Sequence, residues 1–274
     1  MGLDQAEKGR RFRALHEAPG AFVMANAFDG GSARVLAGLG FVALATSSGA
    51  CAASLGRRDG SVTREEALTH ARIIVGATDL PVSADLEKGF GDAPEAAAET
   101  IRQAAAVGLV GGSIEDASGD PARPIFDLDH AVERVAAAAE AAHALPFPFT
   151  LTARSENFLH GRADLEDTIR RLQAFERAGA DVLFAPALPD LAAVRRVCAA
   201  LTKPVSFMVA IPGRSFSMAE LTAAGVRRVS LATSLYRVAL GALVTAGREI
   251  HTRGTFGYLE HALPSRELNE FLSP

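Results

Sequence analysis

The chain has 274 residues, nearly half of them apolar (49%), and carries a formal net charge of −4 at pH 7. This mild charge, with Lys and Arg scattered along the chain, excludes the concentrated basic patch of a nucleic-acid-binding protein. The N-terminus carries charges throughout and lacks the apolar core of a signal peptide, and no run of about eighteen apolar residues follows. We therefore expect a cytoplasmic protein with no membrane partner and no disulfide.

The first predicted element is a helix over about residues 4–17. Short runs rich in Val, Phe, Leu and Ala then alternate with longer amphipathic stretches, the pattern of βαβ units in a parallel sheet. The predicted strands lie at 21–27, 41–47, 81–86, 111–116, 149–154, 181–187, 205–210 and 228–233. A C-terminal tail over 253–274 has helical apolar spacing, so we expect it to pack on the domain.

Cap residues mark where the helices between these strands begin and end. Predicted N-caps are Asp29, Thr63, Asp164 and Asp190. Several helices stop at a glycine just before the next strand, because glycine adopts the left-handed C-cap conformation at little cost. Eight strands alternating with eight helices predict an α/β fold, a single (β/α)₈ TIM barrel domain over 1–274. A doubly wound sheet is disfavoured, since no phosphate-binding glycine fingerprint follows the first strand.

Charged residues gather where the predicted strands end, which is where barrels carry their active sites. They are Asp59 in the loop after the second strand, Asp85 and Glu87 on the third, Glu115 and Asp116 on the fourth, and Arg154 and Glu156 on the fifth. Asp85 and Glu87 would point the same way if the strand geometry persists that far. Carboxylates at one mouth repel each other unless a cation lies among them, so we predict a Mg²⁺ site. For any single pair, a helix cap or a surface ion pair is the alternative.

Four motifs in chain order resemble those of one known superfamily. They are SSGACAASLGRRD (47–59), ADLEKGFGD (84–92), GGSIEDA (111–117) and ARSENF (153–158). In combination and spacing they resemble the isocitrate lyase and phosphoenolpyruvate mutase superfamily, over about residues 20–240. The resemblance implies a TIM barrel whose eighth helix is often exchanged between subunits of a homodimer or homotetramer. It also implies Mg²⁺ or Mn²⁺ as cofactor and a small 2-oxo or 2-hydroxy carboxylate as substrate.

The resemblance also implies a role for each charged position at the metal. Asp85 resembles the carboxylate that touches the metal directly. Asp59, Glu87 and Glu115 resemble those that act largely through metal-bound water. Glu87 stands where the family has an aspartate, and a role through water tolerates its extra methylene. Lys88, where the family commonly has a small or polar residue, is expected to face solvent.

The substrate-binding residues implied by the resemblance come from two motifs. Ser48, Gly49 and Ala50 resemble the loop that holds the substrate's carboxylate and oxo oxygens. Arg154 resembles the arginine that pairs with that carboxylate, in keeping with the bidentate geometry of guanidinium. Glu156 completes the predicted substrate-binding set, and Arg154 and Ser48 are the predicted catalytic residues.

The residues that would act on the substrate at C3 depart from the family pattern. Isocitrate lyases carry a Lys-Arg-Cys-Gly-His segment after the strand-four glutamate, where this chain reads DASGDPARPIFDLD. Neither Cys51 nor Cys198 takes the place of that catalytic cysteine. The mutase branch has a lysine- and asparagine-bearing gate and a histidine after strand six, where Ala185 and Pro186 stand here. The loop around 119–124 still resembles a lid at the catalytic face.

We therefore favour a Mg²⁺-dependent, lyase-like enzyme that breaks or makes a bond at C3 through a metal-stabilised enolate. Two alternatives remain open at this point. One is carbon–phosphorus chemistry of the phosphoenolpyruvate mutase or phosphonopyruvate hydrolase type. The other is a barrel that binds a 2-oxo acid without turning it over.

Overall fold

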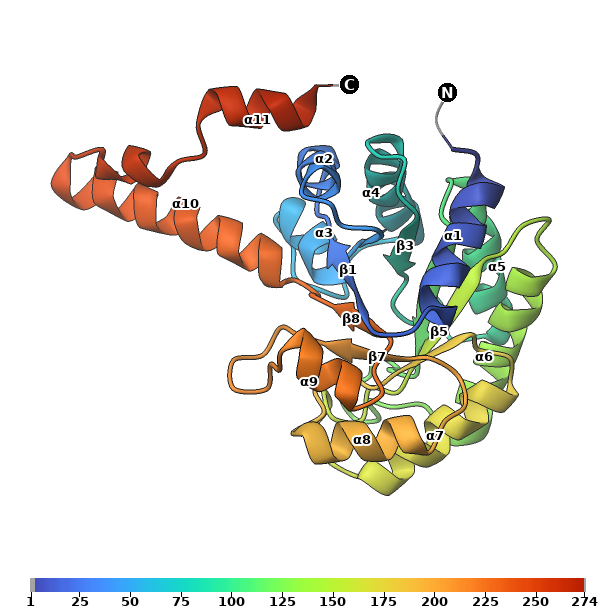
Figure 1. Cartoon of the computed structure of the whole chain (residues 1–274). Coiled ribbons are helices and arrows are strands. Elements are labelled where there is room, and N and C mark those ends of the chain that lie inside the picture. Colours follow the sequence, from blue (N-terminus) through green and yellow to red (C-terminus); the bar gives the residue numbers. More distant parts are fainter. Residues whose placement is uncertain (1–2, 274) are drawn as a thin grey trace.

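The computed structural model describes residues 3–273 and contains a closed barrel of eight parallel strands (Figure 1). Each strand pairs with its neighbours in sequence order, and β8 closes the barrel on β1. The strands are β1 (Phe22–Asn26), β2 (Leu44–Ala45), β3 (Val82–Asp85), β4 (Gly111–Glu115), β5 (Thr150–Arg154), β6 (Val182–Phe184), β7 (Val205–Met208) and β8 (Arg228–Ser230). The predicted TIM barrel is confirmed, with every strand inside its predicted range.

Helices alternate with the strands and follow the last one, and the short helix α3 among them was not expected. They are α1 (Gln5–Glu17), α2 (Gly30–Gly38), α3 (Ser48–Ser54), α4 (Arg64–Gly76), α5 (Pro94–Ala106), α6 (Leu128–His143), α7 (Leu165–Arg177), α8 (Leu191–Ala199), α9 (Met218–Ala223), α10 (Ser234–Arg253), the 3₁₀ turn η1 (Gly257–His261) and α11 (Ser265–Leu272). The segment predicted as a substrate loop, 48–50, is the first turn of the short helix α3.

The predicted caps explain where several helices begin. Asp29 and Thr63 form capping boxes with residues three positions on, and Asp164 and Asp190 accept backbone N–H groups of α7 and α8. These side-chain oxygens satisfy donors that the first helical turn leaves unpaired. Gly179 has a φ of +103° at the turn into β6, as the left-handed cap requires.

Helix α1 closes the amino-terminal end of the barrel. Phe12 is fully buried and packs with Met24 and Ala45 from the first two strands. On the next turn of α1, His16 is also buried and its ring contacts that of Phe22. The amino-terminal end of the barrel is therefore covered by α1.

Helix α10 does not cover the barrel that precedes it. It leaves β8 and runs away from the barrel, while α11 returns to lie beside α2 (Figure 1). None of its residues is buried; Val238 is 71% exposed and Leu243 66%. The tail packs on the domain only at its end, with Phe271 against Gly38 and Arg34 Nη1 donating to Leu272 O at 3.1 Å; Phe256 and Leu259 are exposed. No helix between residues 3 and 273 has the length and apolar character needed to span a membrane.

Candidate active site

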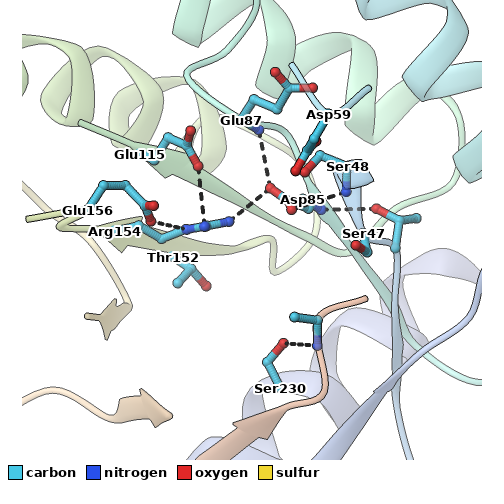
Figure 2. A network of polar contacts seen from close by, with 12 residues as sticks. Ser47, Ser48, Asp59, Asp85, Glu87, Glu115, Thr152, Arg154, Glu156 and Ser230 are labelled. Atoms are coloured by element: carbon cyan, nitrogen blue, oxygen red, sulfur yellow. Dashed lines mark hydrogen bonds and ion pairs between the residues drawn. The ribbon is translucent and has the colours of Figure 1, made fainter. Parts of the chain in front are cut away.

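The charged residues predicted at the strand ends, except Asp116, come together at the open end of the barrel (Figure 2). Asp85, Glu115 and Arg154 are the last residues of β3, β4 and β5. In the sheet register Glu115 lies directly beside Arg154, and Asp85 lies beside Ser113 of β4. The parallel register places the three side chains at one edge of the barrel.

Arg154 lies at the centre of this group and contacts three carboxylates. Nη1 is 3.0 Å from Asp85 Oδ1, Nη2 is 3.4 Å from Glu115 Oε2, and Nε donates to Glu156 Oε1 at 2.9 Å. Its guanidinium also lies 5.3 Å from the centre of the Phe184 ring. Burial lowers the pKa of Arg154, but the three carboxylates outweigh it and hold that pKa well above its ordinary value. Arg154 is thus a permanent cation at this site.

The carboxylates outnumber this cation, and their pKa values reflect it. Burial first, and then Asp85 and Asp59, raise the pKa of Glu87 to about 7. Burial likewise raises the pKa of Glu115 well above its ordinary value, against the opposing effect of Arg154. Burial also raises the pKa of Asp59. The residue as a whole is exposed, but it lines the cavity. A bound cation would relieve this excess of negative charge.

Glu87 differs from the extended geometry that the sequence predicts. Strand β3 ends at Asp85, and Glu87 has a φ of +49°, in the left-handed region that non-glycine residues rarely adopt. Its N–H donates to Asp85 Oδ1 at 3.3 Å, so the two side chains do not simply extend from one strand face. Its Oε1 is buried without a hydrogen-bond partner within residues 3–273. A strained backbone and an orphaned buried oxygen both fit a residue that faces a cation.

The donor set fits a hard cation held mainly through water. Within the described residues, no three His, Cys, Asp or Glu side chains are close enough together to enclose one ion. Mg²⁺ does not require such a cage, because it keeps several waters and binds through one or two carboxylates. The all-oxygen set of Asp85, Asp59, Glu87 and Glu115 matches that preference.

Helix α3 brings the predicted substrate-binding turn against these acids. Ser48 N–H donates to Asp85 Oδ2 at 3.2 Å, and the Ser48 hydroxyl lowers the pKa of Asp59 against the effect of burial. Gly49 has little room for a side chain, since a Cβ there would lie 3.1 Å from Asp59 Oδ2 and 3.2 Å from Thr233 Oγ1. Ala50 N–H is 3.4 Å from Ser47 Oγ, the cap of the helix, and Ala50 itself is buried.

Two cavities meet at this group. One, of about 160 Å³, reaches into the barrel interior, and the other, of about 730 Å³, forms the mouth. Ser48, Asp59 and Arg154 line both. Glu156, only 3% exposed, and His160 line the mouth, whereas Cys51 and Cys198 lie outside both cavities. The four predicted metal residues, Ser48, Arg154 and Glu156 therefore line this pair of cavities, whereas the predicted substrate residues Gly49 and Ala50 line neither.

A buried network behind the site was missed from the sequence. Asp116, grouped with Glu115 in the sequence, turns away from the mouth; its Oδ1 accepts the Glu156 N–H at 2.8 Å. Its Oδ2 lies 3.2 Å from Arg171 Nη1, which also donates to Phe126 O at 2.9 Å. Burial raises the pKa of Asp116 to about 6, although the contacts with the Glu156 N–H and Arg171 lower it. The network fixes the backbone beside Arg154, and the alternation of strand residues was the signal that Asp116 faces outward.

The lid segment is tethered by a lysine that was expected to face solvent. Lys88 Nζ contacts Asp92 Oδ1 and Ser118 O, both at 2.5 Å, so this expectation was wrong. Beneath it, the buried Arg134 donates to the carbonyls of Lys88, Gly91 and Asp92. The lid is closed into a small hairpin by an antiparallel bridge between 117 and 125. Lys88 therefore joins the loop after β3 to the lid after β4.

Comparisons with known proteins agree with this geometry. The phosphoenolpyruvate phosphomutase family model matches residues 12–251, from α1 through all eight strands into α10. A solved structure from Burkholderia cenocepacia J2315, a candidate lyase/mutase, is 51% identical, with a TM-score of 0.96 over 98% of this chain and 97% of that one.

Two named relatives are more distant. The chain is 30% identical to an oxaloacetate decarboxylase of Chromohalobacter salexigens, over 87% of this chain and 83% of that one. It is 29% identical to the 2-methylisocitrate lyase of Escherichia coli K12, over 84% of this chain and 79% of that one. Both similarities extend over most of the barrel.

Proposed function

Because the chain belongs to the isocitrate lyase and phosphoenolpyruvate mutase superfamily, and is an enzyme of that type, we propose that it cleaves or forms a carbon–carbon bond. The bond is the one at C3 of a small 2-oxo or 2-hydroxy carboxylate, and Mg²⁺ or Mn²⁺ is the cofactor. The observation that carries the proposal is the excess of carboxylates around Arg154, with Glu87 Oε1 buried and unpartnered among the described residues.

The residues that would hold the cation belong to the group of carboxylates that outnumbers Arg154. Asp85 would contact the ion directly, and Asp59, Glu87 and Glu115 would act through water, as the family resemblance implies. When bound, the ion supplies Lewis-acid stabilisation for the negative charge that develops on the C2 oxygen. Its positive charge would lower the raised pKa values of Asp59, Glu87 and Glu115, because a nearby cation favours the ionised carboxylate.

Arg154 orients the substrate from the opposite side. Glu156 binds its Nε, so that Nη1 and Nη2 are directed toward Asp85 of β3 and toward Glu115 on the neighbouring strand. These two nitrogens form the fork that suits a carboxylate. Substrate carboxylate and bound cation are thereby placed on adjacent strand ends, which positions C3 in the shared cavity and lowers the entropic cost of reaction.

Two observations favour carbon–carbon over carbon–phosphorus chemistry. The named relatives are a lyase and a decarboxylase, whose names describe carbon–carbon cleavage. In addition, β6 runs into Ala185 and Pro186, which offer no histidine of the kind that the mutase branch carries there. Ser118, Gly119, Asp120 and His160 are among the residues that line the mouth.

A turnover screen tests the proposal. The purified protein is incubated with small 2-oxo and 2-hydroxy acids, with and without Mg²⁺, and products are identified by NMR. We expect Mg²⁺-dependent carbon–carbon cleavage that Asp85→Ala abolishes and that Asp129→Ala, at an exposed carboxylate on α6, leaves intact. Phosphonate products would contradict the proposal, and so would saturable binding without any product.

We also propose that α10 is exchanged between subunits of a homodimer or homotetramer. Its apolar side chains are exposed in the single chain, and an apolar groove of about 450 Å³ runs past Phe28, Leu55, Ile73 and Tyr236. Burying such surface against a second copy would stabilise both. Light scattering should show a dimer or larger, and a double Val238→Asp, Leu243→Asp variant should shift it to monomer; a monomeric parent protein would refute the exchange.

A further inference from the structure

The interior of the barrel beneath the active site is unusually polar. TIM barrels normally fill this space with layers of bulky branched side chains. Here the inward positions carry small hydroxyl residues, and the cavity of about 160 Å³ reaches down between them. The hydroxyl residues within the strands that line it are Ser83, Ser113, Thr152 and Ser230. This space is several times the roughly 30 Å³ share of one water molecule, so it accommodates a small ligand.

A second arginine, Arg228 at the start of β8, lines the same cavity as Arg154. Arg228 is only 2% exposed. Its Nε donates to Ser206 Oγ at 3.1 Å and its Nη2 to Thr152 Oγ1 at 3.0 Å. Its Nη1 lies 3.5 Å from His16 Nε2. Every one of these partners is a neutral group.

The histidine beside Arg228 is itself held neutral. Burial first, and then Arg228, lower the pKa of His16 to about 3. Its Nδ1 lies 2.8 Å from Phe12 O, which can only accept, so Nδ1 carries the proton and Nε2 presents a lone pair to Arg228. Within residues 3–273 no carboxylate forms an ion pair with Arg228, in contrast to Arg154. Burial and then Arg154 lower the pKa of Arg228 to about 9, which leaves it charged at pH 7.

A buried charge without a counter-ion is costly, and buried charges in proteins are normally paired. The fold nevertheless supports Arg228 with three hydrogen bonds and leaves two further N–H groups of the guanidinium. Those donors, the hydroxyls above them and the cavity together form a site with the chemistry of an anion receptor.

We propose that Arg228 and the surrounding hydroxyls form an anion subsite for a carboxylate, and that this carboxylate is the second acid group of the substrate. The inference rests on the proposed function, in which the 2-oxo or 2-hydroxy acid head binds between Arg154 and the cation. Thr152 and Arg154 lie two residues apart on β5, about 6.6 Å along a parallel strand. The two arginines therefore bracket one cavity, and a short-chain diacid fits with one carboxylate toward each.

Ligand binding in the presence of Mg²⁺ tests the subsite without requiring turnover. Calorimetry compares oxalate, which occupies only the head position, with 2-oxobutyrate and 2-oxoglutarate, which differ in the second carboxylate. We expect the parent protein to prefer 2-oxoglutarate over 2-oxobutyrate by about tenfold or more, the value of one charge-assisted hydrogen-bonded pair. Arg228→Met should remove this preference and leave oxalate affinity within about twofold.

Arg227→Met is the matched control. Arg227 precedes Arg228 and is partly exposed, so its loss should leave the diacid preference unchanged. Thermal melts in the absence of ligand verify that each variant folds. Should Arg228→Met fail to fold, Arg228→Lys provides the second variant: it keeps the charge but not the fork, and should reduce the preference without abolishing it.

The outcomes separate the inference from the function on which it rests. Mg²⁺-dependent oxalate binding with no diacid preference in the parent protein would overturn the subsite and leave the proposed function standing. Absence of oxalate binding at any Mg²⁺ concentration would refute the proposed function itself. If chloride or nitrate raises the melting temperature through Arg228 while no diacid preference exists, the site takes a free inorganic anion, and its assignment to the substrate is wrong.

Discussion

Two buried arginines line the same cavity and differ in how their charge is balanced. Arg154, at the end of β5, contacts three carboxylates, whereas Arg228, at the start of β8, contacts two hydroxyls and a neutral imidazole. Both guanidinium groups are removed from water, with Arg154 13% exposed on its side chain and Arg228 2% exposed overall. We call the residues around Arg154, at the carboxyl ends of the strands, the upper layer, and those around Arg228, deeper in the barrel, the lower layer. The upper layer has an excess of negative charge, and the lower layer has an excess of positive charge.

This difference indicates what each layer binds. The upper layer has more carboxylates than one arginine can neutralise, so it is suited to a cation and to a substrate head group held beside that cation. The lower layer has one positive charge and only neutral partners, so it is suited to an anion. A diacid would place one carboxylate beside the cation of the upper layer and the other beside Arg228 in the lower layer.

The largest expected effect is on the free energy of unfolding, and its size differs between the two arginines. Arg154→Met leaves the buried carboxylates of Asp85, Glu115 and Glu156 without their cation, which should cost about 3–5 kcal/mol in the free energy of unfolding. Arg228→Met removes a charge that has no counter-ion, so we expect a change within about 1 kcal/mol, or a gain. Urea denaturation of both variants without metal measures this, and equal losses would refute the contrast.

His16 should make the lower layer sensitive to acid. Its pKa in the folded protein is about 3, below the ordinary 6.5, so the unfolded chain binds more protons between these values. Stability contributed by neutral His16 is therefore complete above pH 6.5 and is lost as pH falls toward 3. At pH 5 the loss in the free energy of unfolding is about 2 kcal/mol. In His16→Gln, which keeps a neutral acceptor near Arg228, the drop in stability from pH 7.5 to pH 5 should be smaller by that amount; parallel curves would contradict the assignment.

Glu87 tests the upper layer. Glu87→Gln removes a buried negative charge near the proposed cation, and outer ligands of this kind typically contribute tenfold or more in metal affinity. We expect Mg²⁺ affinity, measured by calorimetry, to fall by at least about tenfold, while the metal-free protein melts at a higher temperature. Glu95→Gln, at an exposed position in the first turn of α5, is the control. Unchanged Mg²⁺ affinity in Glu87→Gln would remove this residue from the site.

Local signals in the sequence were sufficient for the barrel. Alternating apolar runs, capping residues such as Thr63 and left-handed glycines such as Gly179 act over a few residues, and each was found where it was predicted. The same holds for the position of Asp85, Glu115 and Arg154 at neighbouring strand ends, because parallel strands order these ends automatically.

Features that depend on distant contacts could not be predicted in this way. Glu87 leaves the extended conformation, Asp116 turns to meet Arg171 of α7, and Lys88 reaches the lid after β4. Arg228 is the clearest case, since an arginine at the start of a strand is usually read as a surface residue. Its surroundings include Thr152 of β5, Ser206 of β7 and His16 of α1, all far from it in the sequence.

Gly49 gives the smallest and most local test of the upper layer. A methyl group there would lie 3.1 Å from Asp59 Oδ2 and 3.2 Å from Thr233 Oγ1, so these neighbours must move by a few tenths of an ångström. We expect Gly49→Ala to cost about 1 kcal/mol in stability and to weaken Mg²⁺ binding severalfold, because Asp59 is displaced.

The control for Gly49 is Gly76→Ala, at an exposed helix end where a Cβ meets nothing within 4 Å. It should leave Mg²⁺ affinity unchanged. The two variants add the same atom, so a difference between them reports the crowding at Asp59 rather than the loss of glycine. Equal Mg²⁺ affinity in both would mean that Asp59 tolerates displacement, and the cation would then depend on Asp85, Glu87 and Glu115 alone.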